Sequence, residues 1–507
     1  MVSIRQLNLK RGTIPLRNIG IEFNKKDFEY DVYSLVKAFY PFEEIETYYQ
    51  GDERDSEFEV FFWLDYEDDK ITLRIEKDSK KVFDETIFLN YYLNRKDTKN
   101  QMKRLLYRAL VDVTKKKLPW GTLTGIRPTK IPTQLLESNM SNPQIANYMR
   151  ETYYCSDRKV SLAVAIANQE ARLLSEFDYK SGYSLYIGIP FCPSICLYCS
   201  FGSHPIKQYE DRVEAYLKAL FKEIEFVGEA FADKRLDTIY IGGGTPTTLS
   251  AKQMERLLQH VCDCVDIKDV REFTVEAGRP DSITKDKLEV IAKFPVTRIS
   301  INPQTMNQET LDVIGRKHTV AAIEEAFALA RQSGFTNINM DLIVGLPGEG
   351  EAEVANTLRQ IKGLNPDSVT VHSLSLKRTA RLTLFKDEFC DTTFANNQRI
   401  MDMAADATLD MQMRPYYLYR QKNIAGNFEN VGYSKPDKMG IYNILIIEEK
   451  QTIMAVGAGA ATKLVFAEGK RVERVESVKD VDAYIARVDE MIERKRIGIE
   501  KWLKQKT

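Results

Sequence analysis

The sequence lacks the features that mark several common classes of protein. Its formal net charge is −1 over 507 residues, so no global positive field indicates binding to nucleic acid or to an anionic membrane. Seven cysteines in so long a chain do not form the dense framework of a secreted disulfide protein. The first residues lack the apolar core of a signal peptide, and no uninterrupted apolar stretch is long enough to span a bilayer. We therefore expect a cytoplasmic protein in a reducing compartment.

The length and apolar content allow more than one domain. A chain of 507 residues, 43% of them hydrophobic, can hold about two to four domains with substantial cores. Residues 1–175 mix two patterns. The runs 57–66 and 70–76, separated by the turn-like E-D-D, predict a β-hairpin, and 101–113 has the apolar spacing of a helix. We expect an N-terminal α+β accessory domain in this region.

The central region, residues 176–378, alternates strand-like and helical segments. Amphipathic helical stretches such as 209–226 and 321–333 lie between short apolar runs. Six βα units of this kind indicate an α/β fold with a parallel sheet and right-handed crossovers. The expected strands are 184–189, 237–241, 272–276, 297–301, 337–343 and 367–372.

The remaining residues, 379–507, predict a C-terminal α+β extension. A helix is expected over 396–413, followed by a strand pair that leads into the small-residue run M-A-V-G-A-G-A-A-T-K at 454–463. A final amphipathic helix is expected over 481–504. No internal repeat or low-complexity tract occurs in the chain.

Three of the seven cysteines lie within eight residues. Cys192, Cys196 and Cys199 occur in F-C-P-S-I-C-L-Y-C-S-F. Three thiolates in a C-x3-C-x2-C run can hold three corners of a [4Fe–4S] cluster and leave the fourth iron open to a ligand. A zinc site is the alternative, but zinc ligands usually come as two close pairs, and His204 alone is a poor fourth ligand. The triplet therefore favours the cluster over zinc.

The triplet follows an apolar run, 184–191, so the cysteines lie in the loop that leaves a buried strand. This arrangement resembles that of the radical S-adenosylmethionine enzymes. Further motifs follow downstream: Y-I-G-G-G-T-P-T-T-L (240–249), F-T-V-E-A-G-R-P (273–280), R-I-S-I-N-P-Q-T (298–305), I-G-R-K-H-T (314–319) and N-M-D-L-I-V-G-L-P-G-E (339–349). In order and spacing they are similar to the oxygen-independent coproporphyrinogen III oxidase family.

Two further stretches resemble the long HemZ-type coproporphyrinogen dehydrogenases of that family. They are L-P-W-G-T-L-T-G-I-R-P-T-K (118–130) and Y-L-Y-R-Q-K-N-I-A-G-N-F-E-N-V-G-Y (417–433). The first carries glycine, proline and basic residues, and two interpretations stay open for it. It contacts an anion, or it is a linker that packs against the core.

The resemblance implies an incomplete (β/α)6 radical-SAM barrel, with the chemistry at the C-terminal ends of its strands. It also implies two cofactors, a [4Fe–4S] cluster and S-adenosylmethionine. In the family, S-adenosylmethionine binds the open iron through its amino and carboxylate groups, and an electron from the cluster cleaves it to a 5′-deoxyadenosyl radical. The cluster ligands implied here are Cys192, Cys196 and Cys199.

The resemblance assigns the glycine turn and two tyrosines to S-adenosylmethionine. Gly243, Gly244 and Thr245 end the second strand and are implied to hold the methionine moiety, since glycines let the backbone approach a ligand. Tyr198 matches the aromatic position beside adenine, and Tyr186 on the first strand matches another cofactor contact. A plain turn and packing beneath the cluster are the structural alternatives.

Four polar residues also match family positions that contact S-adenosylmethionine. Arg316 can pair with its carboxylate through a planar fork, and Glu276 can accept from its ammonium group. Gln304 and Asp341 can bond the ribose hydroxyls. Asp341 lies within the expected strand 337–343, where a carboxylate without a partner would be costly.

Two residues depart from the pattern of the coproporphyrinogen dehydrogenases. These have a further cysteine where this chain has Phe201, and a histidine where it has Gly188. Both departures are shared with the HemW branch, whose members bind haem and act as chaperones. Three functions therefore stay open: oxidative decarboxylation of coproporphyrinogen III to protoporphyrinogen IX, haem binding as a HemW-type chaperone, and radical methylation or degradation of haem.

The expected partners follow from these functions. They are a tetrapyrrole and a low-potential electron donor of the flavodoxin or ferredoxin type, with no nucleic acid and no membrane span. Arg420, Lys422 and Arg378 carry charges that suit the propionate carboxylates of a tetrapyrrole. His372, at the end of the last expected strand, either faces the pocket or is a hydrogen-bonded core residue.

Overall fold

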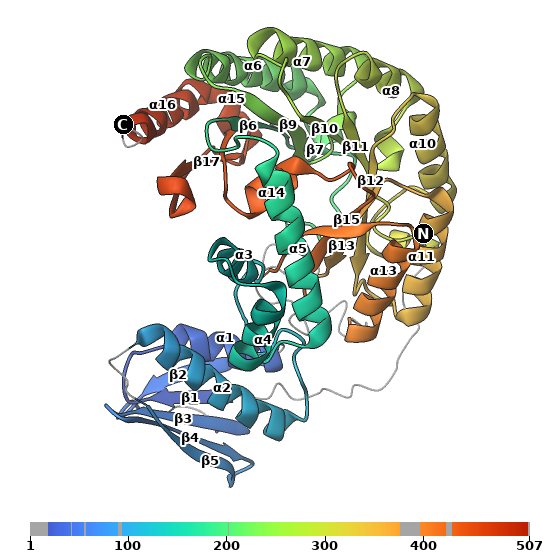
Figure 1. Cartoon of the computed structure of the whole chain (residues 1–507). Helices are drawn as coiled ribbons and strands as arrows, with labels where there is room; N and C mark the ends of the chain where they lie inside the picture. Colours follow the sequence, from blue (N-terminus) through green and yellow to red (C-terminus); the bar gives the residue numbers. More distant parts are fainter. Residues whose placement is uncertain are drawn as a thin grey trace. The chain divides into compact units, whose positions relative to one another are not determined.

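The computed structural model describes residues 19–41, 43–54, 57–89, 94–200, 202–375, 396–421 and 428–504. The chain forms two compact units, drawn in Figure 1. The smaller unit comprises residues 1–124 and 147–157, and the larger comprises 125–146 and 158–507. The three domains expected from the sequence, 1–175, 176–378 and 379–507, stay a prediction, and the second of their boundaries lies outside the described residues.

The described part of the smaller unit contains a five-stranded sheet, the helices α1 and α2, and the C-terminal part of α4 (Asn142–Tyr153). The strand order is β2-β1-β3-β4-β5, with β1 parallel to β2 and β3 and the other pairs antiparallel. The hairpin predicted from 57–66 and 70–76 is confirmed as β3 and β4. The elements are β1 (Ile19–Phe23), α1 (Glu29–Phe39), β2 (Ile45–Tyr49), β3 (Val60–Tyr66), β4 (Lys70–Lys77), β5 (Lys80–Phe88) and α2 (Arg95–Thr114).

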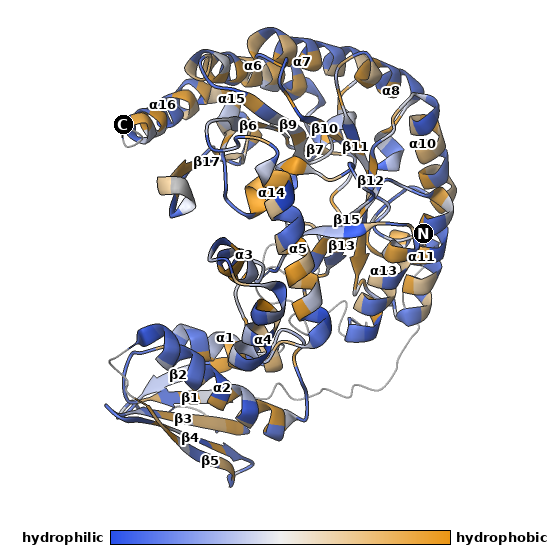
Figure 2. Cartoon of the chain, in the orientation of Figure 1, coloured by the Kyte–Doolittle hydropathy of each residue, from blue (hydrophilic) through white to orange (hydrophobic). Residues whose placement is uncertain are grey.

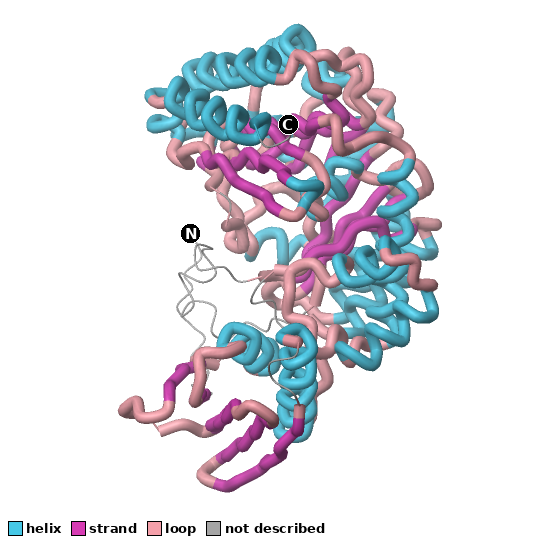
Figure 3. Tube along the Cα trace, turned by 60° about the vertical axis from the view of Figure 1, so that its left-hand side comes forward, coloured by secondary structure: helices cyan, strands magenta, loops and turns pink. Residues whose placement is uncertain are grey.

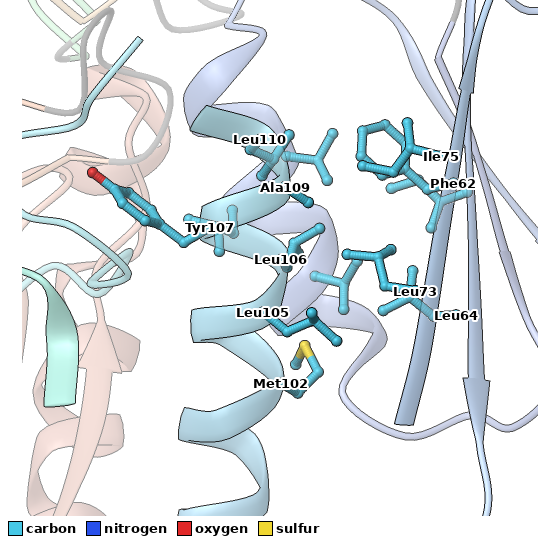
Figure 4. Packing of buried hydrophobic residues seen from close by; sticks show 14 of the residues in the cluster. Phe62, Leu64, Leu73, Ile75, Met102, Leu105, Leu106, Tyr107, Ala109 and Leu110 are labelled. Atoms are coloured by element: carbon cyan, nitrogen blue, oxygen red, sulfur yellow. The ribbon is translucent and has the colours of Figure 1, made fainter. Parts of the chain in front are cut away.

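Alternating side chains build the core of this unit. In β3, Phe62 and Leu64 are buried, as are Leu73 and Ile75 in β4, because every second residue of a strand faces the same side. Figure 4 shows these side chains packed against apolar residues of α2, such as Leu106. The alternation of apolar and polar residues in the strands, together with the apolar side of α2, therefore forms the core of this additional N-terminal sheet.

The larger unit contains an eleven-stranded sheet with the six predicted central strands in its middle. They lie side by side in chain order and pair in parallel throughout. Their bounds are β6 (Tyr183–Ile189), β9 (Leu236–Gly243), β10 (Glu272–Gly278), β11 (Arg298–Ile301), β12 (Ile338–Val344) and β13 (Ser368–Ser373). The fold is thus mixed α/β.

Helices connect these strands and cover the sheet, as Figures 1 and 3 show. Each has one apolar side; in α7, for example, Met254, Leu257, Leu258 and Val261 are buried. Figure 2 shows hydrophobic and hydrophilic residues alternating along them, the pattern of helices packed on a core. These helices are α6 (Val213–Ala230), α7 (Ala251–Cys264), α8 (Lys285–Ala292), α9 (Gln308–Val313), α10 (Val320–Gln332) and α11 (Glu351–Leu364).

C-terminal strands extend both edges of this sheet. β15 (Asn430–Ser434) pairs antiparallel with β13, and β14 (Arg414–Tyr419) pairs with β15. At the other edge, β16 (Thr452–Val456) runs parallel to β6, a seventh parallel strand that the sequence did not predict. The hairpin β17 (Ala461–Phe466) and β18 (Arg471–Glu476) completes that edge.

The remaining helices lie outside the sheet. They are α3 (Lys130–Glu137), α4 (Asn142–Tyr153), α5 (Asp157–Ser175), α13 (Gln398–Asp410), α14 (Ile441–Ile447), α15 (Val481–Ala486) and α16 (Val488–Lys504). The single helix expected over 481–504 is therefore two helices, because the backbone at Arg487 leaves the helical conformation. Among the described residues, no helix combines the length and the apolar character that crossing a membrane requires.

Candidate active site

The carboxyl ends of the central strands open onto a cavity of about 300 Å³ in the larger unit. In parallel α/β sheets this edge is where ligands bind, because the loops that leave the strands meet there. Predicted cluster and cofactor residues from the ends of β6, β9, β10, β11 and β12 or from the loops that follow them line it. They are Cys192, Cys196, Tyr198, Cys199, Gly243, Gly244, Thr245, Glu276, Gln304, Arg316 and Asp341.

Tyr186 does not belong to this lining. Its ring stacks on Tyr240 and Tyr442, with centroids 6.2 and 6.3 Å away and nearly parallel planes. Tyr240 and Tyr442 stack at 4.5 Å. The hydroxyl of Tyr186 nevertheless lies 3.1 Å from the place where a side chain at Gly243 would begin. Its contact with the cofactor stays a prediction.

Hydrogen bonds from several elements hold the cysteine loop, residues 189–200, which starts at the last residue of β6. Two residues, Phe191 and Cys192, form the short strand β7, which pairs with β8 (His204–Pro205). The amide of Leu197 donates to the carbonyl of Ile314 at 3.0 Å, and the amide of Cys199 donates to that of Cys196 at 3.1 Å. These bonds fix the loop between the end of β6 and the segment that follows α9.

No disulfide joins the three thiols of the loop, which are partly shielded from solvent. Burial raises the pKa of Cys192, whose sulfur lies 3.5 Å from the hydroxyl of Thr245. In the described part of the chain no three His, Cys, Asp or Glu side chains surround the position of a single metal ion. Thiolates that bind separate iron atoms of one cluster lie farther apart than ligands of one ion.

The glycine turn after β9 packs directly on the cysteine loop. The amide of Gly244 donates to the carbonyl of Ile189, and that of Thr245 to Phe191, both at 2.7 Å. A Cβ at Gly244 would lie only 2.5 Å from the carbonyl oxygen of Phe191. Glycine is therefore required by close backbone approach, and these two amides bind the cysteine loop rather than pointing to the cavity.

The polar residues expected to contact the cofactor have unusual electrostatic surroundings. Burial raises the pKa of Glu276 to about 7, although the hydroxyl of Tyr240 donates to its carboxylate. Burial also acts to raise the pKa of Asp341, but hydrogen bonds, first that from His372, hold it below its usual value. Glu276 and Asp341 thus differ in charge near neutral pH, although both carboxyl groups line one cavity.

Two side chains in the cavity have polar atoms without a partner among the described residues. The Oε1 atom of Gln304 is buried and accepts no hydrogen bond, and the same holds for Nε of Arg316 as a donor. Gln304 adopts a positive φ of 69°, and its backbone bridges the main chain of Asp341 and Ile343 at 2.9 Å. Buried polar atoms normally have partners, so this cavity fits a polar ligand.

Residues beyond β12 complete the lining of the cavity. His372, at the end of β13, lies 3.8 Å from the carboxylate of Asp341 and 3.4 Å from the hydroxyl of Tyr419. Tyr419 and Gln421 face the cavity, whereas the buried Arg420 between them is absent from its lining. Neighbouring residues of an extended chain point to opposite sides, which explains the difference.

Sequence reasoning found His372 as one of two alternatives but missed Tyr419, Gln421 and Arg279. All three occur in motifs already identified, yet their chemistry follows only from which way each side chain points. Two basic residues expected to meet propionates, Lys422 and Arg378, lie outside the described residues, as does Phe201.

The segment 125–130 has a structural role within the larger unit. Arg127 forms an ion pair with Glu449 at 2.9 Å and donates to the carbonyl of Ile447. Thr129 donates to the buried carboxylate of Glu448 at 3.2 Å. Of the two interpretations of this segment, the contacts therefore support the linker that packs against the core.

Comparisons with known proteins agree with this geometry. Residues 186–361 match the family model of the radical SAM superfamily. The chain is 39% identical over 477 residues to the oxygen-independent coproporphyrinogen-III oxidase-like protein HemZ of Bacillus subtilis, covering 91% of this chain and 93% of the relative. It is 33% identical over 285 residues to the heme chaperone HemW of Lactococcus lactis, covering 55% of this chain and 69% of the relative.

Coproporphyrinogen III oxidase (HemN) from Escherichia coli, described as a radical SAM enzyme, aligns with a TM-score of 0.49 and 24% identity, over 64% of this chain and 72% of that chain. The extent of the match to HemZ is what decides the family. The chain belongs to the radical SAM superfamily and, within it, to the family of HemZ-like, oxygen-independent coproporphyrinogen-III oxidase-like proteins.

Proposed function

We propose that this radical SAM enzyme oxidatively decarboxylates two propionate side chains of coproporphyrinogen III and so forms the vinyl groups of protoporphyrinogen IX. Membership of the superfamily implies a [4Fe–4S] cluster and S-adenosylmethionine. Together they would supply, when bound, an electron and a 5′-deoxyadenosyl radical that removes a β-hydrogen from a propionate. The substrate radical left behind would release CO2 and pass one electron to a one-electron acceptor, which leaves the vinyl group. The observation that carries the proposal is a single cavity lined by the cysteine triplet and by polar groups from the later strands.

In this proposal the cysteine loop and the glycine turn hold the cofactors. Cys192, Cys196 and Cys199 bind three irons of the cluster, and the loop bonds to Ile314 and Gly244 keep the thiols in place. The residues at the end of β9, Gly243 to Thr245, lie against the methionine end of S-adenosylmethionine. Tyr198 lies near its adenine, and Tyr186 makes a further contact with it. The incomplete (β/α)6 barrel is the frame proposed for these contacts.

The unpartnered polar atoms support the rest of the cofactor site. Arg316 pairs with the carboxylate of S-adenosylmethionine, and Glu276 accepts from its ammonium group. Gln304 and Asp341 bond the ribose hydroxyls, which gives the buried Oε1 of Gln304 a donor that the described residues do not provide. The residues present therefore suit an amino acid joined to a nucleoside.

The substrate lies, in this proposal, on the side of Tyr419 and His372. Hydroxyl, imidazole and the amide of Gln421 can donate to a propionate carboxylate or accept from a pyrrole N–H. The carboxylate of Asp341 lies 3.8 Å from His372, so the two proposed ligands meet across this contact. A low-potential flavodoxin or ferredoxin is the proposed electron donor.

An anaerobic assay tests the reaction. The reconstituted protein receives a low-potential reductant, S-adenosylmethionine and coproporphyrinogen III, and mass spectrometry follows the tetrapyrrole. We expect two successive losses of CO2 with two hydrogens, and none in a Cys196→Ala variant, which also forms no 5′-deoxyadenosine. A Cys262→Ala variant is the control, because Cys262 lies on α7 and does not line the cavity.

A second candidate function is haem binding of the HemW type. Gly188 favours it, because the oxidases have histidine there. The carbonyl of Gly188 accepts from Tyr216 at 2.7 Å, and a Cβ at this position would lie 3.3 Å from the carbonyl of Val456. Stoichiometric haem binding without any loss of CO2 from coproporphyrinogen III would support this function and refute the first.

A further inference from the structure

Arg279 reaches from the end of β10 to the cysteine loop. Its Nη1 atom donates to the carbonyl of Ser194 at 3.2 Å and to the hydroxyl of Ser194 at 3.0 Å. The same nitrogen lies 3.5 Å from the sulfur of Cys196. Arg279 is only 3% exposed although it lines the cavity, so water screens these contacts weakly.

The opposite edge of the same guanidinium is held by a carboxylate. Nε and Nη2 donate to the two oxygens of Asp281 at 2.9 and 2.7 Å, a bidentate pair of fixed geometry. The backbone sets up this arrangement, since Gly278 takes a positive φ of 53° and the chain turns tightly before Arg279. The fork therefore aims Nη1 at the cysteine loop.

A cation beside a cluster ligand affects electron transfer. One-electron reduction of a cluster adds one negative charge and takes up no proton, so a guanidinium close to a ligand thiolate stabilises the reduced state. Asp281 has the opposite charge, and through the same pair it weakens that effect. The contact with Ser194 additionally holds the loop between Cys192 and Cys196.

We propose that Arg279 is a positioning residue that holds the loop at Cys196 and raises the reduction potential of the cluster there, and that Asp281 limits this increase. The proposal rests on the proposed function only in requiring the cluster at the cysteine triplet. It gives the G-R-P-D segment, 278–281, a role in electron transfer. Because of Arg279, a low-potential one-electron donor reduces the cluster more readily.

Two variants with opposite charge changes separate this role from a purely structural one. Arg279→Gln removes the cation, and Asp281→Asn removes the charge that opposes it. Redox titration of the reconstituted proteins, followed by electron paramagnetic resonance, measures the potential. We expect Arg279→Gln to shift the reduction equilibrium about tenfold toward the oxidised cluster, which is about 59 mV more negative, and Asp281→Asn to shift it the other way.

Arg256→Gln is the matched control. Arg256 lies on α7 and pairs with Glu214 on the surface, away from the cavity, so the variant removes one positive charge without touching the loop. Its potential should equal that of the wild type. Potentials unchanged in both test variants, or shifted in the same direction, would overturn the proposal, because a merely structural defect has no reason to depend on the sign of the charge.

A further variant and a cluster-free measurement cover the case in which Arg279→Gln assembles no cluster. Arg279→Lys retains the charge with a shorter reach, so we expect a potential close to that of the wild type; a shift toward the oxidised cluster as large as the tenfold expected for Arg279→Gln contradicts the proposal. In the cluster-free protein, hydrogen exchange at the amides of Leu197 and Cys199 should rise about tenfold in Arg279→Gln and stay unchanged in Arg256→Gln. Unchanged exchange in both would refute the role of Arg279 in holding the loop.

The two proposals fail in different ways. A protein whose variants shift the potential in opposite directions, but which does not decarboxylate coproporphyrinogen III, refutes the proposed reaction and leaves the role of Arg279 intact. A protein that decarboxylates its substrate while the variants keep the wild-type potential refutes only the role of Arg279.

Discussion

Replacing Gly244 by alanine would test how tightly the turn after β9 packs on the cysteine loop. The new Cβ would lie 2.5 Å from the carbonyl oxygen of Phe191 and 2.9 Å from that of Ile189. An ordinary contact begins at 3.4 Å, so the two segments must separate by about 0.9 Å. Neither oxygen can rotate away, because both belong to the backbone.

The separation has a predictable energetic cost. Overpacking of this kind costs about 1–3 kcal/mol. The two 2.7 Å bonds from the amides of Gly244 and Thr245 would also lengthen, and each contributes about 1 kcal/mol. We therefore expect Gly244→Ala to lower the free energy of unfolding of the larger unit by about 2–4 kcal/mol.

Calorimetry of the cluster-free protein measures this loss, with Gly363→Ala as the control. Gly363 lies in α11 with no atom within 4 Å of a new Cβ, so alanine should stabilise the helix by up to about 1 kcal/mol. After reconstitution, Gly244→Ala should also bind S-adenosylmethionine at least about tenfold more weakly, since tenfold corresponds to 1.4 kcal/mol. If it matched the wild type in stability and in affinity, the close packing of the two loops would be wrong.

Three further predictions concern other parts of the larger unit. Burial raises the pKa of Glu276 to about 7, so the buried charge lowers the free energy of unfolding as pH rises from about 4.5 through 7. In a pH series of unfolding measurements, Glu276→Gln should remove this decline in stability. An unchanged dependence of stability on pH would contradict the shifted pKa. Tyr419→Phe should weaken binding of coproporphyrinogen III about fivefold without changing the affinity for S-adenosylmethionine, as equilibrium binding to each ligand would show; equal loss for both ligands would argue against a substrate role. Lys495→Met leaves the buried carboxylate of Glu223, 2.6 Å away, without its cation and should lower the free energy of unfolding by about 3–5 kcal/mol. Lys501→Met breaks an exposed pair with Glu473 and should cost less than about 1 kcal/mol in the same unfolding measurement. Similar losses in both variants would show that burial does not determine the strength of these ion pairs.

The sequence predicts the central part of the fold well, because each strand is a short apolar run with a turn after it. The expected strand 184–189 is β6 at Tyr183–Ile189, and 367–372 is β13 at Ser368–Ser373. The expected location of most predicted cofactor residues follows from these strands, since the strand ends of a parallel sheet gather at one edge. Motif order along the chain is therefore sufficient to bring Cys192 and Asp341 to the same cavity.

Long-range pairing and side-chain direction could not be predicted in the same way. β16 pairs with β6 across more than 250 residues, and no local pattern specifies that neighbour. The resemblance predicts Tyr186 in the cofactor site, but whether its ring lines the cavity depends on its stacking with Tyr240 and Tyr442, which come from distant segments. The reach of Arg279 to Cys196 likewise depends on a turn at Gly278 and on a pair with a residue two positions away.

The most direct test of the proposed reaction uses coproporphyrinogen III with deuterium at the β-carbons of its propionates. Under anaerobic turnover, mass spectrometry of 5′-deoxyadenosine and of the tetrapyrrole should show one deuterium in each 5′-deoxyadenosine and two such molecules for each protoporphyrinogen IX. Unlabelled 5′-deoxyadenosine, or 5′-deoxyadenosine formed while the tetrapyrrole keeps all its carboxyl groups, would contradict hydrogen abstraction from the propionate. Either result would also contradict the assignment of this cavity to decarboxylation.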